Sequence, residues 1–262
     1  MIVRSLQLTD FRNYSSLQLE LGAGVHALIG DNAQGKTNLV EALVVLSTMK
    51  SFRGVTNDAA VRKGATSAFI RADIVHDDDR EFLVEIEFKS AGRSVAQVNR
   101  KRIVRTRDLL GVLRTTVFMP DDRNLVHGGA SERRALLDDA VVAVEPSRLD
   151  LVSELERVVR QRNALLKDAG YRPSSAVLAA LDAWDEKLAA LGDEVGAARA
   201  ALLAEMTPFV QSSYAALAGE AREVFLTYSA DWRVGGLASA LAESRENDLR
   251  RGTTTVGPHR DD

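Results

Sequence analysis

The sequence contains no cysteine in its 262 residues. That absence excludes disulfide bonds, thiolate catalysis, zinc sites built on cysteine and a cysteine hook. No run approaches the about 20 apolar residues that a membrane span requires, and the chain does not open with a signal peptide. The sequence therefore predicts a cytoplasmic protein that has no membrane partner.

An excess of basic charge is also missing, since the formal net charge is -3. The chain as a whole has no attraction to DNA, so any nucleic-acid contact must come from a local patch. Hydrophobic residues make up 45% and charged residues 27%, which is ordinary for a soluble globular protein. The length suffices for one large domain or two moderate ones.

The first third of the chain is rich in strand patterns. Apolar and polar residues alternate at about residues 6–8, 17–21 and 82–88, and a hairpin partner is expected at 95–98. A compact apolar run bounded by glycines predicts another strand at 25–29. A helix is expected from about Thr37, because Leu39, Leu43, Leu46 and Met49 share one helical face.

After Pro120 helical patterns dominate. One helix is predicted over 147–169, with Gly170 and Pro173 as its stop. A second is expected to end at Pro208, and its apolar seam follows a four-three alternation through Val177, Leu181, Trp184, Leu188, Leu191, Val195, Ala198 and Leu202. A short connection at 171–174 would make the two an antiparallel hairpin. Further strands are expected at 224–228 and 254–256, and a helix at 237–249.

The strongest local motif is GDNAQGKT at residues 30–37, which matches GxxxxGK[ST] between a predicted strand and a predicted helix. The glycines allow backbone amides to curve around phosphate oxygens, and the helix start adds unpaired N–H groups. Lys36 would reach the β and γ phosphates, and the Thr37 hydroxyl would join the Mg²⁺ shell. The predicted nucleotide-binding residues are Gly30, Asp31, Asn32, Ala33, Gln34, Gly35, Lys36 and Thr37. The alternative is a glycine-rich turn that matches by chance.

A phosphate-binding loop alone does not select one function, because the same fold serves many. The Asn-Lys-x-Asp motif with which GTPases read the base does not occur, so ATP is the expected nucleotide. A conventional P-loop enzyme or transporter motor stays open as an alternative. So does an interaction module that needs no nucleotide.

Three blocks of sequence carry a family resemblance. The first is LTDFRNY at 8–14 together with the phosphate loop, extended through Asn38, Leu39, Glu41 and Ala42. The second comprises PDD at 120–122, LVHGG at 125–129, RR at 133–134 and LD at 137–138, and the third is GPHRDD at 257–262. In these blocks the chain resembles the RecF family, compact DNA-repair relatives of SMC-type ATPases.

The resemblance implies an α/β fold, namely a P-loop ABC-type ATPase head with an N-terminal β-rich lobe and an inserted α-helical lobe. Residues 1–119 would be the ATP-binding lobe and 120–250 the helical lobe with its hairpin. Residues 251–262 would be a strand that returns to the ATP lobe. Family members continue through a serine-glycine signature segment and an acidic Walker B strand, which this sequence lacks. We therefore expect slow ATP turnover only from a complete protein.

The resemblance also implies partners. It adds Asn38 and Arg12 to the ATP site, places Asn13 with Arg12 near the nucleotide, and implies an ATP-dependent homodimer. It implies binding to gapped or junction DNA, preferring single-strand/double-strand boundaries, and assistance to RecA loading with RecO and RecR. Roles in DNA replication, DNA repair and the SOS response follow by the same resemblance. For Arg12, the alternative is a side chain on a solvated strand edge.

Several other charged residues allow two interpretations. The densest basic stretch comprises Arg93, Arg100, Lys101, Arg102, Arg105 and Arg107. Arg100, Lys101, Arg102 and Arg105 are candidate DNA contacts, or else this hairpin tip is solvated and balances the acidic turn at 77–79. Arg133 and Arg134 would face DNA, a partner head or nearby Asp138 and Asp139, and the ion-pair interpretation is favoured. His259 and Arg260 would lie near the ATP lobe by family logic.

Overall fold

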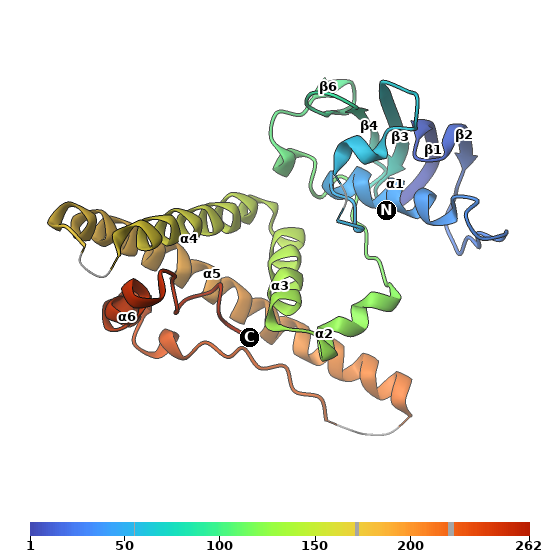
Figure 1. Ribbon diagram of the computed structural model, residues 1–262. Coiled ribbons are helices and arrows are strands. Elements are labelled where there is room, and N and C mark those ends of the chain that lie inside the picture. Colours follow the sequence, from blue (N-terminus) through green and yellow to red (C-terminus); the bar gives the residue numbers. More distant parts are fainter. Residues whose placement is uncertain (55, 171–172, 220–222) are drawn as a thin grey trace. The chain divides into compact units, whose positions relative to one another are not determined.

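A computed structural model describes residues 1–54, 56–170, 173–219 and 223–262. The chain divides into two compact units, Met1–Met119 and Pro120–Asp262 (Figure 1). Each unit has its own apolar core, so each is described by itself.

The first unit is built on a six-stranded antiparallel sheet with the order β2-β1-β3-β4-β5-β6. Its strands are β1 (Ile2–Phe11), β2 (Tyr14–Glu20), β3 (Ser67–Val75), β4 (Glu81–Lys89), β5 (Val95–Val98) and β6 (Lys101–Arg102). Leu6 pairs with Leu19 across β1 and β2, and Ile70 pairs with Ile86 across β3 and β4. The strands predicted near residues 6–8, 17–21, 82–88 and 95–98 are confirmed.

One face of this sheet packs against helix α1 (Lys36–Thr48). Ile70, Ile86 and Phe88 from the strands share a buried cluster with Ala42 and Leu46 from the helix. The opposite sheet face carries polar pairs, such as the Ser5 hydroxyl, which donates to Asp73 at 2.6 Å. The period-two alternation therefore separates a core face from a polar face. Short 3-10 helices η1 (Asn57–Ala60) and η2 (Thr106–Asp108) lie in the connections.

Residues 25–29 do not form the predicted strand. Val25 is 100% exposed and Ile29 is 92% exposed, and in the described part of the chain this segment pairs with no strand. A strand exists only through ladder hydrogen bonds to a neighbour, and an apolar sequence does not supply that neighbour. The strands predicted at 224–228 and 254–256 are likewise not formed.

The second unit is helical, and its main helices are α3 (Ala130–Val144), α4 (Leu149–Ala169), α5 (Ser175–Ala218) and α6 (Leu237–Arg251). The smaller ones are η3 (Pro120–Arg123), α2 (Asn124–His127), η4 (Pro146–Arg148) and η5 (Asp231–Val234). Val158, Leu188, Leu237 and Leu241 are in its buried core. Helix α4 packs along α5, and the predicted helices are confirmed. Tyr171 and Arg172, in the predicted connection, lie outside the described residues.

Helix α5 differs from the prediction at Pro208. The helix runs for 44 residues and continues through this proline to Ala218. Proline removes one backbone N–H donor, but the turns on either side keep their own hydrogen bonds, so a long helix can pass through it. The expectation that Pro208 ends the helix was wrong.

Two glycines let other elements approach α5 closely. A Cβ atom on Gly192 would lie 2.2 Å from a Leu237 methyl carbon of α6. A Cβ atom on Gly196 would lie 2.8 Å from the Trp232 ring of η5. Both neighbours are buried, so these positions exclude larger side chains. Among the described residues, no helix has the length and apolarity to cross a membrane.

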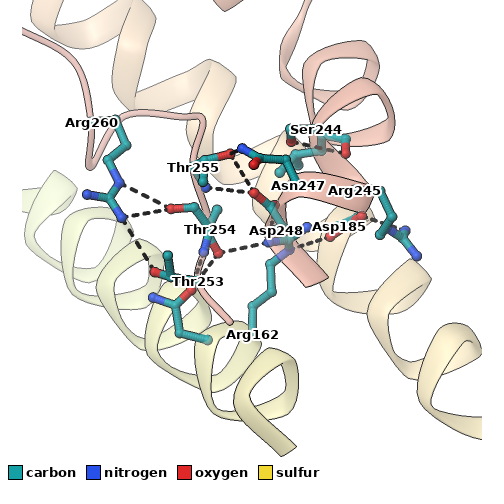
Figure 2. A network of polar contacts seen from close by, with 12 residues as sticks. Arg162, Asp185, Ser244, Arg245, Asn247, Asp248, Thr253, Thr254, Thr255 and Arg260 are labelled. Atoms are coloured by element: carbon teal, nitrogen blue, oxygen red, sulfur yellow. Dashed lines mark hydrogen bonds and ion pairs between the residues drawn. The ribbon is translucent and has the colours of Figure 1, made fainter. Parts of the chain in front are cut away.

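The terminal segment, residues 252–262, belongs to the helical unit and forms no strand. Thr254 receives a hydrogen bond from Arg162 and donates its own N–H to Asn163 at 2.7 Å. Asp248 accepts the N–H of Thr255 at 2.9 Å (Figure 2). Side chains of α4 and α6 thus form hydrogen bonds with polar groups of this segment, including backbone groups that a neighbouring strand would otherwise have paired. The strand predicted within 251–262 was wrong for this reason, and the return of this segment to the ATP lobe stays a prediction.

Candidate nucleotide site

The phosphate loop, residues 30–35, connects the exposed apolar run to the start of α1. Gly30 has φ +153°, Gly35 has φ +102° and Ala33 has φ +66°. A Cβ atom on Gly30 would lie 2.5 Å from the Gln34 side-chain oxygen, and one on Gly35 would lie 2.6 Å from the Asn13 amide. The positive φ values therefore favour glycine at both positions, and a side chain at either would also displace Gln34 or Asn13.

The first turn of α1 offers its backbone donors to an anion. The first hydrogen bond of the helix runs from Leu39 N–H to the Gly35 carbonyl at 3.1 Å. The amides of Lys36, Thr37 and Asn38 precede that bond, and the Gly35 N-cap provides no side-chain acceptor. The first turn contains no acidic residue that would compete with a bound anion. The residues present therefore fit a phosphate chain.

Lys36 spans the mouth of the loop. Its Nζ donates to the Gly30 carbonyl at 2.7 Å and to the Asp31 carbonyl at 2.7 Å. The Thr37 side chain is exposed beside it. Within the described ranges, no group of three or more His, Asp or Glu residues could hold a metal ion. A Mg²⁺ ion would therefore need phosphate oxygens and water together with the Thr37 hydroxyl, which is the usual way this ion is bound.

Asn13 ties the turn between β1 and β2 to the loop. Its Nδ2 donates to the Gln34 carbonyl at 3.1 Å, and its Oδ1 accepts from Asn38 Nδ2 at 2.8 Å. Asn38 was predicted as a site residue, and the structure places it beside Asn13. The family resemblance placed Asn13 near the nucleotide, but its contacts with Gln34 and Asn38 were not predicted.

Arg12 is anchored on a buried carboxylate. Its Nε donates to Glu41 of α1 at 3.1 Å, its Nη2 also contacts Glu41, and its Nη1 donates to the Ala59 carbonyl at 2.6 Å. Glu41 is 1% exposed and also accepts a hydrogen bond from the Ser51 hydroxyl. A guanidinium nitrogen of Arg53 lies 3.6 Å from the Glu41 carboxylate. Arg12 is 13% exposed, so the interpretation as a solvated strand edge was wrong. Its contact with phosphate stays a prediction, and Glu41 was not predicted as part of the site.

Arg100, Lys101 and Arg102 of the basic stretch lie on the β5–β6 hairpin, and the remaining arginines flank it. Asn99 and Arg100 form its turn with φ values of +50° and +63°, and Asn99 Oδ1 accepts from the Leu83 N–H at 2.8 Å. Arg100, Lys101, Arg102 and Arg105 are exposed, and across the described ranges none of them has a carboxylate within ion-pair distance. Asp78 pairs with Arg80 at 2.8 Å, and Asp77 contacts the N-terminal amine. The acidic turn at 77–79 is thus engaged elsewhere.

Arg133 and Arg134 hold the end of the described chain. Arg133 donates to Asp262 at 2.8 Å, and Arg134 donates to the Asp261 carbonyl at 2.6 Å. Asp138 on α3 is instead bound by two N–H groups of Arg199, each at 2.7 Å. Both arginines make these contacts within the helical unit, but the predicted pairing with Asp138 was wrong because Arg199 occupies that carboxylate.

His259 and Arg260 both interact with the Thr254 carbonyl, each at 3.1 Å, inside the helical unit. Burial lowers the pKa of His259 to about 4, and the nearby Arg260 and Arg134 charges act in the same direction. Its Nδ1 is buried without a hydrogen-bond partner in the described structure. Their expected placement near the ATP lobe stays a prediction.

Comparison with known proteins places the chain. A family model described as an AAA domain matches residues 5–127. The chain is 40% identical to the DNA replication and repair protein RecF of Streptomyces avermitilis, over 100% of the chain and 74% of that relative. The chain belongs to the RecF family. The RecF of Frankia alni is also 40% identical, over 98% of the chain and 72% of the relative.

Solved RecF structures share the fold. A structure of the recombination mediator protein RecF-ATPrS in the RecFOR pathway superimposes with a TM-score of 0.91 at 28% identity. It covers 99% of this chain, which spans 72% of the solved one. The RecF-ATP structure gives a TM-score of 0.90 at 28% identity, over 100% of this chain and 72% of its own. The predicted α/β fold of a P-loop ABC-type ATPase head is confirmed.

Proposed function

We propose that this RecF-family chain binds ATP with Mg²⁺ through residues 30–38. The observation that carries the proposal is the uncapped start of α1 next to two glycines whose positive φ values other residues rarely adopt. A phosphate chain is the ligand that such a set of free amides, one lysine and one hydroxyl recognises. The relatives whose structures are described as RecF-ATP and RecF-ATPrS support the choice of ATP.

The roles of individual residues follow from their chemistry. In this proposal the backbone of Gly30, Asp31, Asn32, Ala33, Gln34 and Gly35 surrounds the phosphates. Lys36 leaves the two loop carbonyls for the β and γ phosphates, and Thr37 joins the Mg²⁺ shell. Asn38 and Arg12 complete the site, and residues 1–119 form the ATP-binding lobe. Residues 120–250 form the helical lobe.

The wider function that we propose is DNA repair. The relatives are named DNA replication and repair protein RecF, and the solved relatives are placed in the RecFOR pathway. We propose that the chain, as an ATP-dependent homodimer in the cytoplasm, binds gapped or junction DNA at single-strand/double-strand boundaries. It would act with RecO and RecR in RecA loading and contribute to the SOS response. Exposed Arg100, Lys101, Arg102 and Arg105 support a DNA contact.

Calorimetric titration with Mg-ATP tests the nucleotide site. The native chain should bind, and Lys36→Ala should weaken binding more than about tenfold, because charge-assisted hydrogen bonds contribute roughly 1.5–3 kcal/mol. Lys63→Ala, which removes an exposed lysine of the same unit, is the control and should bind like the native chain. Far-UV circular dichroism should be unchanged in both variants. Absence of binding by the native chain would refute the proposal.

A further inference from the structure

We propose that the turn Arg12–Asn13 is a brace that sets the shape of the phosphate loop, with Asn13 as a positioning residue. The inference rests on the proposed ATP site. The name brace refers here to Arg12, Asn13 and the carboxylate of Glu41. Its function is to hold the loop backbone in the conformation that accepts phosphate before the nucleotide arrives.

Asn13 contacts the loop from both sides. Its amide nitrogen holds the Gln34 carbonyl at 3.1 Å, immediately before Gly35. Its amide oxygen is held by Asn38 at 2.8 Å, in the first turn of α1. One side chain therefore bridges the last loop carbonyl and the helix whose N–H groups would receive phosphate. Fixing a carbonyl also fixes the direction of the amide that follows it in the same peptide plane.

The fit of Asn13 against Gly35 is close. A Cβ atom at position 35 would lie 2.6 Å from both the nitrogen and the oxygen of the Asn13 amide. The glycine therefore serves a second purpose beyond its φ of +102°, since its bare Cα admits the brace. The brace and the loop motif are complementary parts of one structure.

Arg12 fixes the turn in place. Its side chain is held by Glu41 and by the Ala59 carbonyl, and its backbone N–H donates to the Ala60 carbonyl at 2.8 Å. Arg12 has φ +55°, a conformation that costs a non-glycine residue free energy. Such a conformation persists where surrounding contacts hold it, as the Glu41 carboxylate and the Ala59 and Ala60 carbonyls do here. A strained turn, pinned on a buried carboxylate of the phosphate-loop helix, is suited to holding Asn13 in one position.

The affinities for two ligands distinguish a residue that shapes the phosphate-binding loop from one that contacts the base. A brace on the loop backbone affects every ligand that carries the phosphate chain, whatever base is attached. Loss of Asn13 should therefore weaken Mg-ATP and Mg-tripolyphosphate by the same factor. A residue that touched adenine would affect ATP alone.

The test is calorimetric titration of the native chain and of Asn13→Ala with both ligands. We expect Asn13→Ala to weaken binding of each ligand by about tenfold, because each of its two hydrogen bonds contributes roughly threefold. Gln18→Ala removes an exposed amide from β2 and should bind both ligands like the native chain. The unfolding midpoint without ligand should be unchanged in all three proteins, since Asn13 is exposed.

A second set of variants tests the coupling between the two asparagines. Asn38→Ala should cause part of the affinity loss seen for Asn13→Ala. The double variant should lose affinity by less than the product of the two single-variant factors. Glu41→Gln keeps the shape of the side chain that holds Arg12 but removes its charge. It should lower the affinities for Mg-ATP and Mg-tripolyphosphate by the same factor.

The outcomes separate the two proposals. If the native chain binds neither ligand, the ATP site itself is refuted. If the native chain binds and Asn13→Ala binds equally well, the brace is refuted while the ATP site stands. A loss confined to ATP, or independent losses for Asn13 and Asn38, would also overturn the brace.

Discussion

Arg162 on α4 and Asp248 on α6 are 86 residues apart in the sequence and form an ion pair at 2.7 Å in which both side chains are 0% exposed. Arg162 also contacts Asp185 on α5 and donates to the Thr254 hydroxyl at 2.8 Å. One guanidinium thus joins three helices and the terminal segment (Figure 2). This arrangement makes the helical unit sensitive to single substitutions.

Arg162→Met should destabilise the helical unit by about 3–5 kcal/mol, because it leaves buried carboxylates without their partner. The measurement is urea unfolding followed by circular dichroism and by the fluorescence of Trp184 and Trp232, which both lie in the helical unit. Arg160→Met, on the same helix, removes an exposed arginine that lies 3.6 Å from Glu156 and should cost less than about 1 kcal/mol. Similar losses in the two variants would contradict a special role for the buried pair.

His259 should make stability depend on pH. Burial lowers its pKa to about 4 from the ordinary value of 6.5, so between these values the unfolded chain binds a proton that the folded chain does not. The His259 contribution is present above pH 6.5 and is lost as the pH falls toward 4, by at most about 3 kcal/mol. Burial also raises the pKa of Asp261, and this acts in the opposite direction at lower pH.

Urea unfolding at about pH 7 and about pH 5 checks this prediction. His259→Gln keeps a donor for the Thr254 carbonyl but does not titrate, so its stability should change less between the two conditions. His127→Gln removes an exposed imidazole of the same unit and should keep the native dependence. A native-like slope in His259→Gln would show that other groups cause the dependence.

Charge reversal on the β5–β6 hairpin should weaken DNA binding. In the variant Arg100→Glu, Lys101→Glu, Arg102→Glu, affinity for a gapped duplex should fall more than about tenfold, with a salt slope shallower by up to about 3. Fluorescence anisotropy over a salt series, with Mg-ATP present, measures both quantities. The matched control is Lys63→Glu, Arg250→Glu, Arg251→Glu, which makes the same charge change at exposed positions elsewhere. Equal salt slopes of DNA affinity for the two variants would show that the hairpin is a solvated surface and does not contact DNA.

Local patterns predicted most of the elements. Alternating apolar residues predicted the strands near 17–21 and 82–88, and helical spacing predicted α4, α5 and α6. These predictions succeed because each element buries one face, and the apolar residues of that face recur at a regular spacing within one short segment. The phosphate loop was predicted for a similar reason, since its glycines, lysine and threonine act within eight residues. The strand at 25–29 failed because a strand depends on a neighbour that its own sequence does not specify.

The sequence by itself determined the nucleotide motif, the β-rich and helical halves and the family. Only the tertiary structure decided that Asn13 holds the loop, that Glu41 holds Arg12, and that Arg199 rather than Arg134 pairs with Asp138. These pairs are separated by 21, 29 and 61 residues. A polar or charged side chain has many possible partners in the sequence, and packing selects one of them by bringing the two groups together away from water.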